Sequence, residues 1–200
     1  MTTDPLLPAT PDSPVAVSTM HRLESAASLD GLVAAVGRLA RFMPDGAVDT
    51  WLRGLPVGHA LHPFLTDLPI GFWASSVAID LRGRASEETA ADALVVLGLA
   101  STVPAVVTGL AEWRRLPRPD SRTGALHAAL NGVAVGLFGA SLAARRAGAR
   151  STGRGLSLAA TAVTAASGFL GGHLAIARRV GSRHPDAAGP GAAEGLPLPD

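Results

Sequence analysis

The stretch "ALVVLGLASTVPAVVTGLA", residues 93–111, contains no charged residue. Its polar side chains are the small hydroxyls of Ser101, Thr102 and Thr108, which form no polar stripe at helical spacing. A helix that is apolar on all sides lies either in a deep protein core or in a membrane. The run is close to the ~20 residues with which a helix crosses a hydrocarbon core of ~30 Å. The run therefore favours a transmembrane helix over a helix in a soluble, alanine-rich bundle.

Three more apolar runs accompany this one. Residues 124–144 and 155–177 carry no charge, and residues 61–81 are interrupted only by Asp67 and Asp80. We therefore predict four spans, at about 61–81, 91–112, 124–144 and 155–177. The connections between them are short, and short connections place consecutive helices antiparallel. The expected fold is all-α: a four-helix transmembrane bundle with up-down-up-down topology.

Local signals refine the expected helices. Pro63 suits the first turn of the first span, and Thr123 is placed to cap the start of the third. Asp80 is expected to pair with Arg82 or Arg84 at the far end of the first span. Two small-xxx-small patterns predict close approach of helix backbones in lipid; they are Gly132 with Gly136 and Gly168 with Gly172.

The flanking segments have a different composition. Residues 1–19 carry acids and prolines without a basic or apolar region, which predicts a disordered leader rather than a signal peptide. Residues 20–43 place apolar side chains on one helical face, so we expect an amphipathic interfacial helix within residues 20–55. The transmembrane domain is expected over 56–181, and residues 182–200 are expected to form a disordered tail.

Composition excludes several classes of function. The formal net charge is +1, so no global positive field predicts nucleic-acid binding. The chain has no cysteine, which excludes disulfides, thiolate metal sites and cysteine-held iron–sulfur clusters on this chain. No nucleophile elbow, phosphate loop or HExxH motif is found, so we expect no catalytic activity from the chain alone.

The predicted topology brings polar residues of all four spans to the end of the bundle where the termini lie. At a rise of ~1.5 Å per residue, several of them lie roughly 6–8 Å inside that boundary. Ionisable groups inside a membrane are functional candidates, although a helix-dipole role for Asp67 and a surface ion pair for Glu112 stay open. The predicted polar layer consists of His62, Asp67, Glu112, His127, Asn131 and His173, with His59 in the adjoining loop.

Four motifs resemble a family of bacterial membrane proteins called domain of unknown function 2231. They are "GHALHPFLTDLPIGFWASSVAIDL", "TGLAEW", "HAALNGVAVGLF" and "SGFLGGHLAIARRVG", in the family's order, and the resemblance covers about residues 51–181. It implies a four-helix integral membrane domain with motif histidines at His59, His62, His127 and His173. Some relatives carry a Rieske iron–sulfur domain after the fourth span, and without cysteine we expect none here.

Two interpretations of the polar layer follow. In the first, the chain is a redox or metal-binding membrane subunit: His62, His127 and His173 are candidate ligands of a b-type haem. Alternatively a transition metal binds among His59, His62, Asp67, Glu112, His127 and His173, with Asn131 in support. Three histidines and two carboxylates at one depth favour the metal over the haem. In the second, the layer is a proton relay, a transport site or a clamp between helices or partners.

Localisation and partners follow from the same topology. We expect a multi-pass protein of the bacterial plasma membrane, with the lipid bilayer as its surroundings and a redox protein or a second copy as its partner. Eight arginines lie near the span ends on the side of the termini and six on the other side. The positive-inside rule therefore slightly favours cytoplasmic termini.

Overall fold

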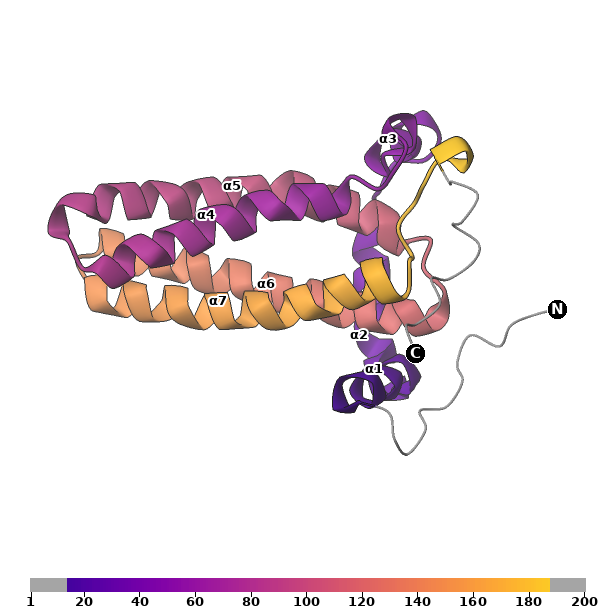
Figure 1. Ribbon diagram of the computed structural model, residues 1–200, viewed down its shortest axis with the longest axis horizontal. Helices are drawn as coiled ribbons and strands as arrows, with labels where there is room; N and C mark the ends of the chain where they lie inside the picture. The colour runs from indigo at the N-terminus through magenta and orange to yellow at the C-terminus, as the bar shows by residue number, and fades with distance from the viewer. Residues whose placement is uncertain (1–13, 188–200) are drawn as a thin grey trace, which may run out of the picture.

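The computed structural model describes residues 14–187 and is helical almost throughout, which confirms the all-α prediction. Four long helices run antiparallel in sequence order (Figure 1). They are α4 (His62–Arg82), α5 (Glu88–Trp113), α6 (Arg118–Arg146) and α7 (Arg150–Gly172), the last continued by a π-helical turn η4 (His173–Ala177). The predictions for residues 1–13 and 188–200 lie outside the described part of the chain.

The long helices extend beyond the uncharged runs that predicted them. Charged and proline residues continue the helices, so α6 begins at Arg118, with a proline in its first turn. Thr123, expected as its N-cap, lies inside the helix and is fully buried. The turns after α4 and α6 use Gly83 and Gly148, whose positive φ angles of 70° and 82° favour glycine.

All four long helices are long and apolar enough to cross a membrane. In their most apolar windows only 22–28% of the residues are buried inside the bundle. The remaining apolar side chains face outward, and an outward apolar surface of this extent is what a lipid environment requires.

Short helices form a collar at the end of the bundle where α4 and α6 begin. They are α1 (Val15–Ser25), η1 (Ala27–Leu29), α2 (Asp30–Ala40), α3 (Ala47–Leu52) and η2 (Leu55–Val57). In Figure 1, α1 and α3 are seen nearly end-on and α2 crosses the long helices. The expected amphipathic segment is thus present but is broken into separate helices, and α1 already begins at Val15, within the stretch expected as leader.

The two hairpins, α4–α5 and α6–α7, are copies of one unit. Position n of α4 corresponds to position n + 65 of α6, and position n of α5 to n + 62 of α7, because equivalent positions of the two helices are three residues closer in sequence in the second hairpin, which has the shorter loop. Identical residues occupy equivalent positions at Ala60/Ala125, Leu61/Leu126, His62/His127, Leu65/Leu130, Gly71/Gly136, Ser76/Ser141, Ala78/Ala143, Gly83/Gly148, Leu94/Leu156, Ala100/Ala162, Thr102/Thr164 and Gly109/Gly171. The repeat has parallel orientation, with its axis along the bundle.

Equivalent residues meet across this axis. Trp73 of α4 stacks on its equivalent Phe138 of α6, with ring centroids 4.1 Å apart and planes 14° apart. Trp73 also fills the space beside Gly98 of α5, where a Cβ would lie 2.2 Å from the indole Nε1. Equivalent hydroxyls make equivalent bonds within each hairpin: Ser76 Oγ donates to Ala91 O and Ser141 Oγ to Gly153 O. Contacts between like positions define a pseudo-two-fold interface.

Close helix contacts involve other glycines than the sequence patterns predicted. A Cβ at any of Gly132, Gly136, Gly168 or Gly172 would meet no atom within 4 Å, so these glycines face away from the neighbouring helices. Close contacts occur instead where a large side chain enters a glycine position. The glycines concerned are Gly98, Gly109, Gly124, Gly153 and Gly171.

Candidate functional site

His62 lies at the first residue of α4 and faces α5. Its Nδ1 is 2.8 Å from the carbonyl oxygen of Ala105, so the Nδ1–H donates to that carbonyl. The ring packs on Gly109, one turn further along α5, where a Cβ would lie 2.7 Å from the ring Cε1. Only glycine leaves room for the imidazole at that position.

His127 of α6 makes the equivalent contacts with α7. Its Nδ1 is 2.8 Å from the carbonyl oxygen of Ser167, and its ring packs on Gly171, where a Cβ would lie 2.9 Å from Cε1. Ser167 and Gly171 are the repeat equivalents of Ala105 and Gly109. Both hairpins therefore hold a histidine in the same way.

The two imidazoles meet between the hairpins. Their ring centroids are 6.2 Å apart and their planes are at 84° to each other. Donation from each Nδ1–H to a backbone carbonyl selects the tautomer whose lone pair is on Nε2. A carbonyl on Nδ1–H also orients histidines that bind metals. The Nε2 lone pair of His127, however, accepts a hydrogen bond from the Asn131 amide.

A polar group from the second repeat completes the site around His127. Asn131 Nδ2 lies 3.0 Å from His127 Nε2, and the buried Ser167 hydroxyl donates to Asn131 Oδ1 at 2.8 Å. The equivalent of Asn131 in α4 is Thr66, whose hydroxyl donates to Pro63 O in its own helix. The site is therefore two-fold in its imidazoles and asymmetric in its other polar groups.

The other residues of the predicted polar layer lie elsewhere. Asp67 is exposed on α4, and His59 is exposed in the preceding loop with its Nδ1 3.0 Å from Ala60 O. Glu112 is buried, and one of its oxygens accepts the Ser182 N–H and hydroxyl at 3.0 and 2.9 Å. It makes no ion pair with Arg114 or Arg115, because those side chains reach the collar.

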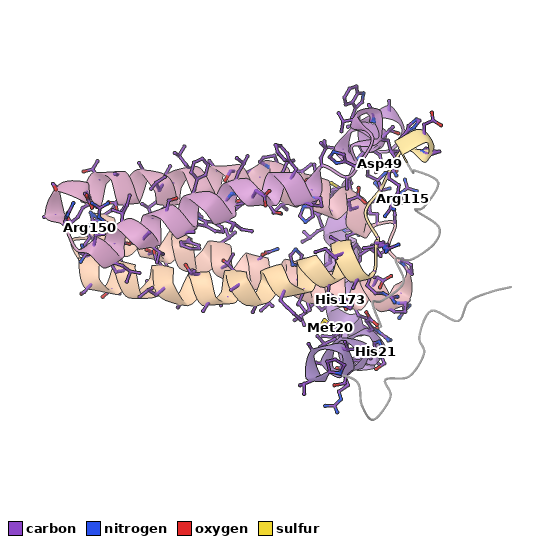
Figure 2. All side chains as sticks on the ribbon, in the orientation of Figure 1. Met20, His21, Asp49, Arg115, Arg150 and His173 are labelled. Carbon is purple, nitrogen blue, oxygen red and sulfur yellow. The ribbon has the colours of Figure 1, made fainter. Side chains whose placement is uncertain are left out.

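His173 contacts the collar and not the other histidines. Its Nε2 lies 2.8 Å from an oxygen of Glu24, a fully buried carboxylate on α1. Arg178 joins them, 3.5 Å from Glu24 and 2.6 Å from Asp120, and the hydrogen bond that it donates to Asp120 raises the pKa of this guanidinium. Figure 2 labels His173 at the end of α7 that faces α1, the helix that carries Met20 and His21.

A second collar contact lies on the other side of the same end. Asp49 of α3 is buried and accepts hydrogen bonds from Arg53 at 2.9 Å and Arg115 at 2.8 Å. Burial raises the pKa of the Asp49 carboxyl, but the two arginines lower it by more, so the resulting pKa lies below its usual value. Figure 2 labels Asp49 and Arg115 together on this side.

No group of three or more His, Asp or Glu side chains in residues 14–187 is arranged to hold a metal ion. Depth in the membrane was predicted from helix direction, but the facing of each side chain depends on rotation about the helix axis. From the sequence we did not predict that Ser167, Gly109 and Gly171 contribute to the histidine site. The repeated motif "ALHxxL", at residues 60–65 and 125–130, is the signal that could have identified them.

Comparisons with known proteins agree with this architecture. No curated protein and no solved structure matches the chain. A family model described as a predicted membrane protein, domain of unknown function 2231, matches residues 58–184, a range that contains all four long helices and both histidines of the pair. The match confirms the resemblance inferred from the four motifs: the chain belongs to the family of membrane proteins called domain of unknown function 2231.

Proposed function

We propose that this membrane protein binds one b-type haem between its two hairpins, held by His62 and His127. The observation that carries the proposal is the pair of imidazoles with ring centroids 6.2 Å apart, each with its Nδ1–H donated to a carbonyl. Two histidines can hold a b-type haem, whereas a zinc site typically takes three or four protein ligands. A pair of histidines therefore favours haem over the metal site that the sequence favoured. To bind the group, His127 Nε2 would have to be released by the Asn131 amide.

The two histidines are close enough to contribute to one site, because their ring centroids are 6.2 Å apart. The pseudo-two-fold axis supports a shared site, because each histidine has an equivalent orienting carbonyl and an equivalent glycine.

The chain's own residues would hold and tune the group. The carbonyls of Ala105 and Ser167 fix the ring orientation and raise the basicity of each Nε2. Haem supplies reversible one-electron transfer when bound, and its apolar surroundings here would exclude water and influence its potential. We propose accordingly that the chain acts as an electron-transfer subunit serving a redox protein partner, without catalytic activity of its own.

A second candidate function is supported by Asn131. Its amide engages His127 Nε2, and Ser167 links the two residues to α7. Such a closed network can serve as an interhelical clamp that needs no ligand. In that case the histidines contribute only to stability.

The absorption spectrum of protein purified from membranes of haem-replete cells distinguishes the two candidates. We expect a low-spin haem spectrum that is lost in His62→Ala and in His127→Ala. The matched controls His59→Ala and His173→Ala keep it, because neither residue lies at the pair. A colourless wild-type protein whose His62→Ala and His127→Ala variants only lose stability would establish the clamp instead.

We further propose a location in the bacterial plasma membrane with the collar on the cytoplasmic side. The small excess of arginines at that end supports this orientation. Exposed apolar side chains of the collar, including Leu39, Phe42 and Trp51, suit the headgroup region of the bilayer.

A further inference from the structure

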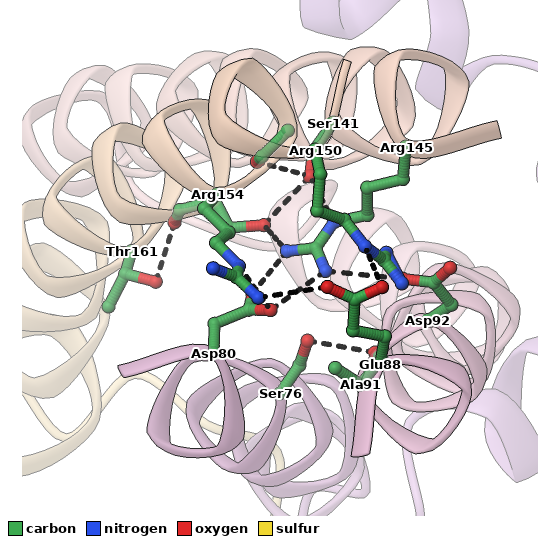
Figure 3. A network of polar contacts seen from close by, with 12 residues as sticks. Ser76, Asp80, Glu88, Ala91, Asp92, Ser141, Arg145, Arg150, Arg154 and Thr161 are labelled. Carbon is green, nitrogen blue, oxygen red and sulfur yellow. Dashed lines mark hydrogen bonds and ion pairs between the residues drawn. The ribbon is translucent and has the colours of Figure 1, made fainter. Parts of the chain in front are cut away.

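The end of the bundle opposite the collar contains six charged residues that the proposed function does not use. They form one connected network of ion pairs between the hairpins, shown in Figure 3. The buried Arg145 side chain, with no exposed surface, is at its centre. We call this network the far-end ion cluster; it consists of Asp80, Glu88 and Asp92 of the first hairpin and Arg145, Arg150 and Arg154 of the second.

From the sequence we predicted that Asp80 pairs with its neighbours Arg82 or Arg84, and this prediction was wrong. Asp80 pairs with Arg145, with one contact at 3.0 Å, and with Arg154 at 3.5 Å. Arg82 and Arg84 instead contact Glu87 at 3.0 and 3.5 Å. A local pairing was expected because neighbours in sequence are always near, whereas the real partner is set by the packing of the hairpins.

The charges of the cluster are reversed between the two copies of the repeat. In the register of the repeat, Asp80 is equivalent to Arg145. Glu88 is equivalent to Arg150 and Asp92 to Arg154. Each of the three acids of the cluster thus has an arginine at its equivalent position in the second hairpin.

The ion pairs themselves obey the two-fold relation. Equivalent residues pair directly across the axis, Asp80 with Arg145 and Glu88 with Arg150 at 3.0 Å. The other contacts come in reciprocal sets. Asp80 with Arg154 matches Arg145 with Asp92, at 3.5 and 3.2 Å. Glu88 with Arg154 matches Arg150 with Asp92, at 3.2 and 2.5 Å.

We propose that the far-end ion cluster is the recognition surface by which the two halves of this duplicated bundle select each other. Two copies of the first hairpin would bring three acids against three acids, and two copies of the second would bring arginines together. Like charges at a poorly solvated interface are strongly disfavoured, so only the unlike pairing is neutral. The partner that this surface fits is therefore a hairpin of the same shape and opposite charge.

Specificity, rather than stability, is the expected contribution of such a cluster. Desolvation offsets much of the attraction within buried ion pairs, but an unpaired charge in the same place is costly. The cluster therefore penalises wrong pairings more than it stabilises the correct one, as charged positions do in selective helix pairing. This proposal is independent of any ligand at the histidine pair.

Charge reversal in the full-length protein tests the proposal. Glu88 and Arg150 are suitable because their side chains are partly exposed, at 33% and 22%. We expect Glu88→Arg and Arg150→Glu each to lower the thermal unfolding midpoint in detergent. The swap Glu88→Arg with Arg150→Glu restores their own pair but leaves like charges against Arg154 and Asp92, so it should recover about half of the summed losses. Adding Asp92→Arg with Arg154→Glu restores those contacts as well, so the fourfold swap should recover more than half of the summed losses of its single reversals.

The matched control removes a charge at the same residues without reversing it. Glu88→Gln and Arg150→Gln create no like-charge contact, so each should lower the unfolding midpoint less than the reversal at the same residue. Single reversals that cost nothing, a fourfold swap that recovers nothing, or neutral variants that cost as much as the reversals would each overturn the proposal.

Discussion

Substitution of Gly98 by alanine tests the packing of the bundle. The new Cβ would lie 2.2 Å from Trp73 Nε1 and 2.4 Å from Cδ1, whereas ordinary contacts begin at 3.4 Å. The indole must therefore move by about 1 Å or more. Trp73 is 5% exposed and stacks on Phe138, so such a shift disturbs the stack.

The expected loss follows from two contributions. Overpacking of a well-packed core costs about 1–3 kcal/mol. Disruption of the 4.1 Å stack with Phe138 costs about 0.5–1.5 kcal/mol more. Gly98→Ala should therefore lower the free energy of unfolding by about 2–4 kcal/mol, which corresponds to roughly 4–16 °C in the unfolding midpoint for a protein of this size.

Thermal unfolding in detergent, followed by far-UV circular dichroism, measures this loss. The control is Gly132→Ala, because a Cβ there meets no atom within 4 Å. The second hairpin also indicates a compensating substitution, because it has Phe138 and Ala160 at the positions equivalent to Trp73 and Gly98. Gly98→Ala combined with Trp73→Phe should regain most of the loss. Equal stability of Gly98→Ala and Gly132→Ala would refute the packing argument.

Three further predictions concern the collar and the topology. Folding lowers the pKa of the Asp49 carboxyl, so the ionised carboxylate stabilises the folded protein. This contribution is fully present above the unfolded pKa of about 3.9 and is lost as pH falls through the lower pKa of the folded state. Asp49→Asn should cost about 2–3 kcal/mol at pH 7, and the difference from wild type in unfolding midpoint should shrink below about pH 4. His173→Ala leaves the buried Glu24 with fewer partners, so limited proteolysis should cut α1 faster, at a cost of about 1–3 kcal/mol, with the haem spectrum unchanged. Single cysteines replacing the exposed Val57 and Arg118 should react with an impermeant thiol reagent from one side of the membrane, and one replacing Arg84 from the other; labelling of all three from one side would contradict the four-span topology.

The sequence predicted those features that depend on length, apolarity and direction. Four apolar runs, three of them uncharged, predicted four antiparallel helices, and helix direction predicted that His62 and His127 lie at the same depth. Depth alone does not determine which way a side chain faces. Asp67 is exposed on α4, and the side chain of His173 reaches α1, although both lie near the depth of the pair.

The missing information was the internal repeat. Once His62 and His127 are recognised as equivalent, their contact across a two-fold axis is expected, and so are the contacts of Trp73 with Phe138 and of Asp80 with its equivalent, Arg145. The repeat is difficult to detect from residue identity because several equivalent positions, such as Trp73 with Phe138 and Asp80 with Arg145, differ in size or charge. Its two helices also follow different spacings, since the second hairpin has the shorter loop.

Titration of haemin into ligand-free protein tests the shared histidine site most directly. For the wild type we predict an absorption endpoint at one haem per chain and a low-spin spectrum. The oxidised sample should give a low-spin EPR signal, because two histidines would hold the iron. His62→Ala and His127→Ala should each abolish the low-spin species. Binding that persists unchanged in the double variant, or a wild-type protein that binds no haem, would contradict the assignment.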